Sequence, residues 1–199
     1  PSAPLLIVAR ALQGAAAAAM MPQVLSMLHA NYPAGPERSR AVGAYGASIG
    51  LGVIAVVSST FGNLAAYFQT NIKRMLAYSS IAQVGYMVLG ISFASVTGLT
   101  AGIVHLMNHA LIKGGLFLAM GCFALRLGSA ELSDMRGIGR RMPVTMFAWV
   151  LGGLGLIGVP LTAGFVSKWY LITAALERGW WQVAALLLIS SLLAAIYVW

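Results

Sequence analysis

An apolar stretch near residues 99–125 contains three ionisable side chains, and this pattern constrains the chain more than any other feature. His105, His109 and Lys113 recur every four residues within it. Because an α-helix turns once in about 3.6 residues, side chains four apart return to nearly the same face. The sequence therefore predicts a helix with a slowly drifting stripe of two histidines and one lysine.

Two explanations of this stripe are open. Ionisable groups inside a membrane span are costly and usually mark a pathway for ions or protons. Alternatively, the side chains lie near a helix end and reach the interface, or the histidines are ordinary core residues with satisfied hydrogen bonds. The mid-span position of Lys113 and the apolar residues that follow it favour a functional role.

The composition assigns the chain to the membrane. Hydrophobic residues make up 60% of it and charged residues only 8%, with a mean hydropathy of +0.87. These values predict a multi-pass protein embedded in the lipid bilayer, and we expect it in the cell inner membrane. The net charge of +8 is scattered over loops and helices, so it indicates topology rather than a nucleic-acid partner.

The single cysteine and the chain ends carry little functional information. Cys122 excludes an internal disulfide and a cysteine-based metal site, and in an apolar helix we expect an inert buried thiol. The chain starts at Pro1 and runs into apolar sequence without the basic region of a signal peptide. We therefore expect a fragment at both ends.

The apolar runs predict an all-α, polytopic transmembrane helical bundle of about six membrane helices. The first two cover residues 4–30 and a run from Ala41, separated by a proline-containing loop at 31–40. Four more are expected near 75–93, 99–125, 143–175 and 181–199.

The run at 143–175 is too long for one straight span, and it contains Pro160 among several glycines. Proline removes a backbone hydrogen bond and clashes with the preceding turn. We therefore predict a discontinuous helix, broken near Gly158 to Gly164, with the freed backbone groups lining a polar cavity or buried in protein.

The N-terminal part resembles one transporter family. The residues that carry the resemblance are Arg10-Ala11-Leu12-Gln13-Gly14, the mid-helix Pro22 and the loop at 31–40. They are similar to the fourth and fifth helices of a major-facilitator drug:proton antiporter, in which the arginine and glutamine serve proton coupling. The resemblance would transfer these roles to Arg10 and Gln13, and it ends at about residue 54.

The remainder resembles a second, unrelated family. Residues 62–86, the His105 to Lys113 stripe and residues 158–170 are similar to the antiporter-type membrane subunits of respiratory complex I and of Mrp cation/proton antiporters. Residues 136–143 favour the Mrp D-type subunit. The resemblance covers the second half of such a subunit and lacks the first repeat, which supplies a membrane glutamate and lysine.

This second resemblance implies roles for four residues. Lys113, with His105 and His109, would form the central proton relay, and Lys168 on the broken helix would be the terminal carrier. Burial disfavours a charged amine, and an amine that can lose its charge can carry a proton. Lys168 has an alternative role as an interfacial anchor beside Trp169 and Tyr170.

Several nearby polar residues have simpler expected roles. We expect Lys73 and Arg74 to mark a cytoplasmic loop, and Glu131 and Asp134 to be solvated partners of the arginines at 126–142. We expect four polar residues of the 75–93 helix to pack helices through hydrogen bonds rather than to line a channel: Tyr78, Ser79, Ser80 and Tyr86.

Topology predicts a junction between two proteins. The positive-inside rule places the Lys73/Arg74 and 126–142 connections in the cytoplasm, which puts the loop around Arg38 outside. In the major-facilitator family that loop is cytoplasmic, so the two resemblances demand opposite orientations. We therefore expect a foreign helix pair at 1–55, the half-subunit at 56–199, and a junction near 53–60.

The resulting hypothesis is proton or cation/proton translocation by a subunit of an Mrp-type antiporter or of a complex I-like NADH:quinone oxidoreductase. We expect other membrane subunits as partners, protons and possibly Na⁺ as transported ions, and no cofactor in this chain, so any redox site would belong to partners. The alternatives are a drug:proton antiporter fragment and an inert structural membrane domain.

Overall fold

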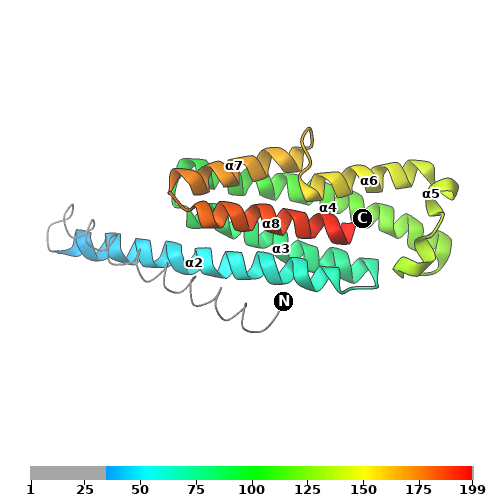
Figure 1. The fold of residues 1–199 in the computed structure, drawn as a ribbon, viewed down its shortest axis with the longest axis horizontal. Helices are drawn as coiled ribbons and strands as arrows, with labels where there is room; N and C mark the ends of the chain where they lie inside the picture. The colour runs from blue at the N-terminus through cyan, green and yellow to red at the C-terminus, as the bar shows by residue number, and fades with distance from the viewer. Residues whose placement is uncertain (1–34, 199) are drawn as a thin grey trace. The chain divides into compact units, whose positions relative to one another are not determined.

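The computed structural model describes residues 35–198. The chain divides into two compact units, Pro1–Ala47 and Ser48–Trp199. Of the first unit only 35–47 is described, so the predicted span at 4–30, with Arg10, Gln13 and Pro22, lies outside the described residues. The helices of the described part, drawn in Figure 1, are α2 (Pro36–Tyr67), α3 (Ile72–Ser92), α4 (Val96–Leu127), α5 (Ile138–Arg141), α6 (Pro143–Ile157), α7 (Ala163–Glu177) and α8 (Trp181–Val198), with a short 3₁₀ turn at Leu132–Met135.

Helix α2 begins earlier than the sequence predicts. Residues 36–40, expected in a loop, form its first turns, because Pro36 is pre-organised for a first helical turn and Glu37 interacts favourably with the helix N-terminus. The helix has 32 residues and continues without interruption through 53–60. The predicted junction in that stretch stays a prediction.

Helices α3 and α4 form an antiparallel pair, close to the predicted spans. The Asn71 side chain caps α3, and the Ser95 hydroxyl accepts a hydrogen bond from the Gly98 amide at the start of α4 (3.0 Å). The two helices approach closely at Gly90 and Gly98, where a Cβ on Gly90 would lie 2.8 Å from the Gly98 carbonyl oxygen. Small residues permit such contacts between membrane helices.

The predicted discontinuous helix is confirmed as α6 and α7, which follow one another with a projecting loop between them (Figure 1). Gly158 ends α6 in the left-handed conformation, at φ +85°. The Thr162 hydroxyl then caps α7 by accepting from the Phe165 amide (3.3 Å). Helix α4 packs against both halves, and α8 also packs against both.

Backbone hydrogen bonds join the connection after α2 to the connection after α4 at one end of the Ser48–Trp199 unit. The Ile72 amide donates to the Ala130 carbonyl oxygen, and the Leu132 amide donates to that of Thr70, both at 2.9 Å. The connections after α2 and after α4 therefore lie at the same end. Lys73 is in the first turn of α3 instead of a loop, since the cap at Asn71 starts the helix earlier.

Glu131 also differs from its prediction. Its Oε1 accepts a hydrogen bond from Asn71 Nδ2 at 2.9 Å. Among the described residues it forms no ion pair with the nearby arginines, because the bridge between the two connections turns it toward Asn71.

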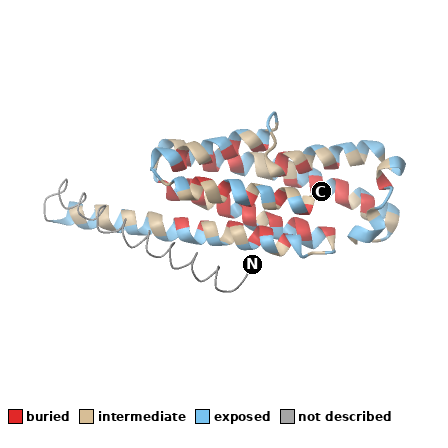
Figure 2. Cartoon of the chain, in the orientation of Figure 1, coloured by how far each residue is buried: buried red, intermediate tan, exposed pale blue. Residues whose placement is uncertain are grey.

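Buried residues gather on the faces that the helices turn toward one another (Figure 2). Many large apolar residues are exposed. On α4 the exposed Leu111, Leu118 and Leu125 repeat every seven residues. Cys122 is exposed on the same helix, so the predicted burial is wrong: an apolar helix can face lipid as well as protein. Within the described residues, four helices are long and apolar enough to cross a membrane: α2, α3, α4 and α8.

Candidate functional site

The four predicted carriers lie on the inner faces of α4 and α7. His105 and Lys113 are buried on α4, Lys168 is buried on α7, and His109 is half-buried. Only 5% of Lys113 and 7% of Lys168 is exposed. The structure thus places both lysines inside the bundle, as predicted, and the snorkelling alternative does not describe their position.

Lys113 faces helix α3. Its Nζ donates to the carbonyl oxygen of Leu76 at 2.6 Å and to the Ser79 hydroxyl. The Leu76 carbonyl is accessible to it because α3 and α4 pack directly against one another. Ser79 therefore contacts a predicted carrier, whereas its neighbour Ser80 bonds only within α3, to the same carbonyl at 3.0 Å.

His105 bridges two helices. Its Nδ1 lies 2.9 Å from the Ser167 hydroxyl on α7, and its Nε2 lies 2.9 Å from Gln83 Oε1 on α3. Which nitrogen donates depends on the tautomer, and an imidazole with partners at both nitrogens can accept a proton on one side and release it on the other. Gln83 and Ser167 were not predicted as site residues. Both are buried polar residues of apolar helices, and the sequence shows only that they are polar.

His109 lies between His105 and Lys113 and is less constrained. Its Nδ1 is buried without a hydrogen-bond partner among the described residues, as is Nε2 of Gln83. His109 lies one helical turn from both His105 and Lys113 on α4. Ser167, whose hydroxyl lies beside His105 Nδ1, is the chain neighbour of Lys168. The four groups therefore form a sequence in space in the order Lys113, His109, His105, Lys168.

Lys168 lies at the break between α6 and α7. Its Nζ donates to the carbonyl oxygens of Leu156 (3.1 Å) and Ile157 (2.7 Å) and to the Ser191 hydroxyl on α8 (3.0 Å). The two carbonyls end α6 and have no partner within that helix, and a helix C-terminus favours a cation. The lysine of one half-helix thus caps the other half.

The residues beside Lys168 point elsewhere. Trp169 is 58% exposed and Tyr170 is 42% exposed, whereas Lys168 is buried. An aromatic anchor at the interface is consistent with Trp169 and Tyr170, but Lys168 does not share their face.

Neither lysine has an acidic partner within the described part of the chain. Without a carboxylate partner, the charge of each lysine is held by hydrogen bonds and dipoles of the protein. The described residues contain no group of three or more His, Cys, Asp or Glu side chains that could hold a metal ion. The arrangement suits storage and transfer of protons.

A second buried polar cluster lies beside the carriers, and the sequence did not reveal it. Asn63 on α2 donates to the Ser190 hydroxyl (2.6 Å), and Tyr86 on α3 donates to the same hydroxyl (2.6 Å). The Tyr197 hydroxyl donates to Asn63 Oδ1 at 3.0 Å. Tyr86 was expected to pack helices; it does so, and it also contacts His105 and Lys168.

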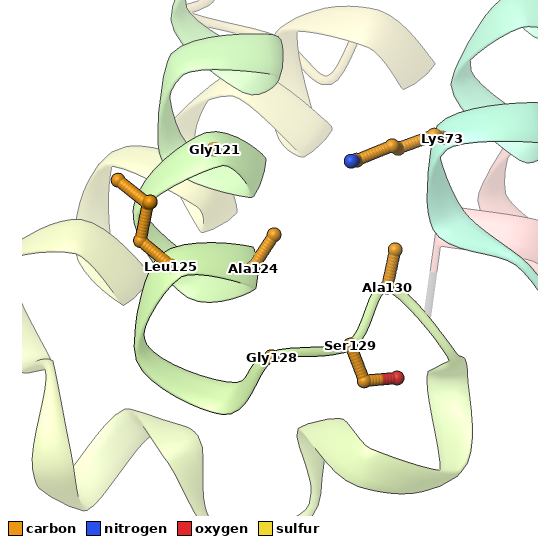
Figure 3. Close-up of a pocket in the computed structure, with 7 residues that line it drawn as sticks. All are labelled: Lys73, Gly121, Ala124, Leu125, Gly128, Ser129 and Ala130. Carbon is orange, nitrogen blue, oxygen red and sulfur yellow. The ribbon is translucent and has the colours of Figure 1, made fainter.

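Two surface concavities of the described part of the chain lie away from the carriers. One lies at the end of α4, where Lys73 points toward a space bounded by Ala124, Leu125 and the 128–130 turn (Figure 3). Another is lined by Thr97 and the outward residues of α7. The four carriers are instead enclosed between helices.

Comparisons with known proteins agree with this geometry. The family described as NADH:quinone oxidoreductase/Mrp antiporter, TM, matches residues 43–194. NADH-quinone oxidoreductase subunit N of Desulforudis audaxviator is 47% identical over 147 residues, which is 74% of this chain and 29% of that protein. The chain therefore spans less than a third of the length of this relative.

Solved structures show the same arrangement of helices. The Mrp complex from Dietzia sp. contains a chain that matches with a TM-score of 0.74 and 32% identity, over 76% of this chain and 28% of that one. Respiratory complex I from Thermus thermophilus with bound NADH matches with a TM-score of 0.73 and 27% identity, over 78% and 33% of the two chains. With a family match over most of its length, the chain belongs to the NADH:quinone oxidoreductase/Mrp antiporter transmembrane family.

Proposed function

We propose that this chain forms part of a proton-translocating membrane subunit in which Lys113, His109, His105 and Lys168 pass protons in that order. The observation that carries the proposal is the enclosure of two lysines, without acidic partners among the described residues, at the ends of a histidine pair. Groups that bind and release protons are required inside a bilayer, and hydrogen bonds or single waters must connect them.

The chemistry assigns a different task to each part of this relay. Lys113 and Lys168 store a proton, and His105, with partners at both ring nitrogens, transfers one. The unpartnered Nδ1 of His109 and Nε2 of Gln83 offer sites where water can complete the path. The break between α6 and α7 supports a role for Lys168 as the group where protons enter or leave the relay, because discontinuous helices place ion sites near the middle of transporters.

We propose a complex I-like NADH:quinone oxidoreductase, rather than an Mrp antiporter, as the host complex. The sequence relative that supports this carries the name of an oxidoreductase subunit N. Protons are then the transported ion, Na⁺ is the alternative that an Mrp assembly would exchange, and other membrane subunits are the partners. Residues 1–55 remain a proposed foreign helix pair, although the family match over 43–194 includes residues 43–55. That match does not favour a drug:proton antiporter for residues 56–199.

The test uses the full-length subunit that carries this segment, assembled in its complex in membrane vesicles. Lys113→Ala and Lys168→Ala should each lower proton uptake per electron transferred by at least about tenfold, the scale of losing one acid/base group. Lys73→Ala is the matched control, because Lys73 is exposed at the start of α3. Unchanged uptake in both lysine variants would favour an inert structural domain, and uptake that requires Na⁺ would favour the Mrp-type alternative.

A further inference from the structure

The charge of Lys168 lacks a carboxylate partner among the described residues, yet it has an aromatic one. The backbone carbonyls of α6 and the Ser191 hydroxyl of α8 accept its hydrogen bonds. The titratable groups that face it are His105 on α4 and Tyr86 on α3. Tyr86 is therefore the side chain of interest.

The Tyr86 ring lies against both Lys168 and His105. Lys168 Nζ is 5.3 Å from the ring centroid, within the range of a cation–π interaction. The His105 ring meets the tyrosine ring edge to face, with centroids 5.5 Å apart at 83°. Since Tyr86 is fully buried, water does not weaken the attraction between its ring face and the ammonium.

The hydroxyl of Tyr86 holds the ring in this orientation. It donates to the Ser190 hydroxyl at 2.6 Å and accepts from Asn63 Nδ2 at 3.3 Å. Asn63 is held in turn by the Tyr197 hydroxyl, so α2 and α8 both fix a residue of α3. Connected buried hydrogen bonds of this kind make a single arrangement rigid.

We propose that Tyr86 is a positioning residue for Lys168: its ring face holds the ammonium beside His105, and its anchored hydroxyl holds the ring. This inference rests on the proposed role of Lys168 as a proton carrier. It extends that role because it assigns the Tyr86 ring a function beyond helix packing. Asn63, Ser190 and Tyr197 then serve to hold this ring in its orientation.

A packing role depends on the shape of the ring, whereas a cation–π role depends on its electron density. The test therefore replaces residue 86 by phenylalanine and by phenylalanines bearing one, two or three ring fluorines, in the full-length subunit assembled in its complex. Fluorine withdraws electron density from the ring face with little change in ring shape. Proton uptake per electron is measured in vesicles, together with the amount of assembled complex.

Tyr86→Phe keeps the ring face but loses the hydroxyl anchor, so it should keep only part of the uptake, and successive fluorines should lower the remaining uptake by about three- to thirtyfold across the series. The control is the same series at Phe93, which is also fully buried but packs on Trp180 and has no lysine over its ring among the described residues. Uptake there should stay constant. If Tyr86→Phe assembles poorly, ring-fluorinated tyrosines replace the series and should show the same decline.

Lys168→Ala separates the two possible failures. If that variant loses uptake while the fluorine series at position 86 is flat, the Tyr86 inference is overturned and the proton relay stands. If Lys168→Ala pumps normally, the proposed function of Lys168 is overturned, and the Tyr86 inference that rests on it is overturned as well. A decline that is equal at positions 86 and 93 would show a general effect of fluorination and would also overturn the inference.

Discussion

Lys168 Nζ lies 2.7 Å from the carbonyl oxygen of Ile157, so a side chain of α7 satisfies the last turn of α6 across the break in the helix. This contact joins the backbone discontinuity and the buried charge into one structure.

Gly158→Ala should disturb both the break and Lys168. At φ +85° an L-residue is strained by about 1–2 kcal/mol, and the new Cβ would lie 2.8 Å from Lys168 Cδ. Gly179→Ala is the control, because it has φ +70° but open space around its Cβ. Both should lower thermal stability, measured on the assembled subunit, and only Gly158→Ala should also lower proton uptake. Equal uptake in the two variants would contradict the prediction.

Ser79→Ala should weaken the site of Lys113. The change removes a hydroxyl that accepts from Nζ and leaves the Leu76 carbonyl oxygen as acceptor. Hydrogen bonds to charged groups contribute about 1.5–3 kcal/mol, so we expect a loss of uptake of about tenfold or more. Ser80→Ala, one residue away, removes a hydroxyl that donates to the same Leu76 carbonyl oxygen but does not contact Lys113, so it should keep most of the uptake. A loss of the same size at both serines would show that the contact with Lys113 is not the cause.

Leu161→Gly should stabilise the protein. Leu161 is fully exposed in the loop between α6 and α7 and has φ +76°, a conformation that costs a leucine about 1–2 kcal/mol. Leu151→Gly provides the opposite case, since Leu151 lies inside α6, where glycine costs about 1 kcal/mol. Thermal unfolding of the assembled subunit should therefore shift upward for the first variant and downward for the second. A decrease for Leu161→Gly would mean that its side chain has a partner in the full assembly.

Asn108→Asp should loosen the start of α7. Asn108 Nδ2 donates to the Ala163 carbonyl oxygen at 2.7 Å, and a carboxylate oxygen cannot replace that donor. Loss of about 1 kcal/mol corresponds to about fivefold faster amide hydrogen exchange in residues 158–162. Met107→Leu, at an exposed neighbour, should leave the exchange unchanged. Unaltered exchange in the aspartate variant would show that other contacts hold the loop.

The spans and the break were predictable because they depend on local rules. A run of apolar residues sets the length of a membrane helix, and Pro160 among glycines interrupts one. Helix starts were less predictable: Pro36 and Asn71 begin α2 and α3 earlier than the hydropathy suggests, since a cap acts on backbone groups rather than on polarity.

Two aspects of the site depended on tertiary contacts and could not be read from one sequence. The four-residue spacing predicted a shared stripe, but the partners of His105 come from two other helices, at Gln83 and Ser167. Likewise, nothing local distinguishes Ser79 from Ser80, yet only the first meets Lys113. Cys122 shows the same limit, because hydropathy does not tell a lipid-facing helix surface from a protein-facing one.

The three acceptors around Lys168 have a consequence for the count of its hydrogens. An ammonium group carries three N–H bonds, which match the carbonyl oxygens of Leu156 and Ile157 and the Ser191 hydroxyl. A neutral amine keeps only two, so loss of the proton must leave one acceptor unsatisfied or turn the Ser191 hydroxyl away from the Leu187 carbonyl oxygen that it bonds at 2.9 Å. Each deprotonation of Lys168 would thus remove one hydrogen bond from the contacts that join α6, α7 and α8.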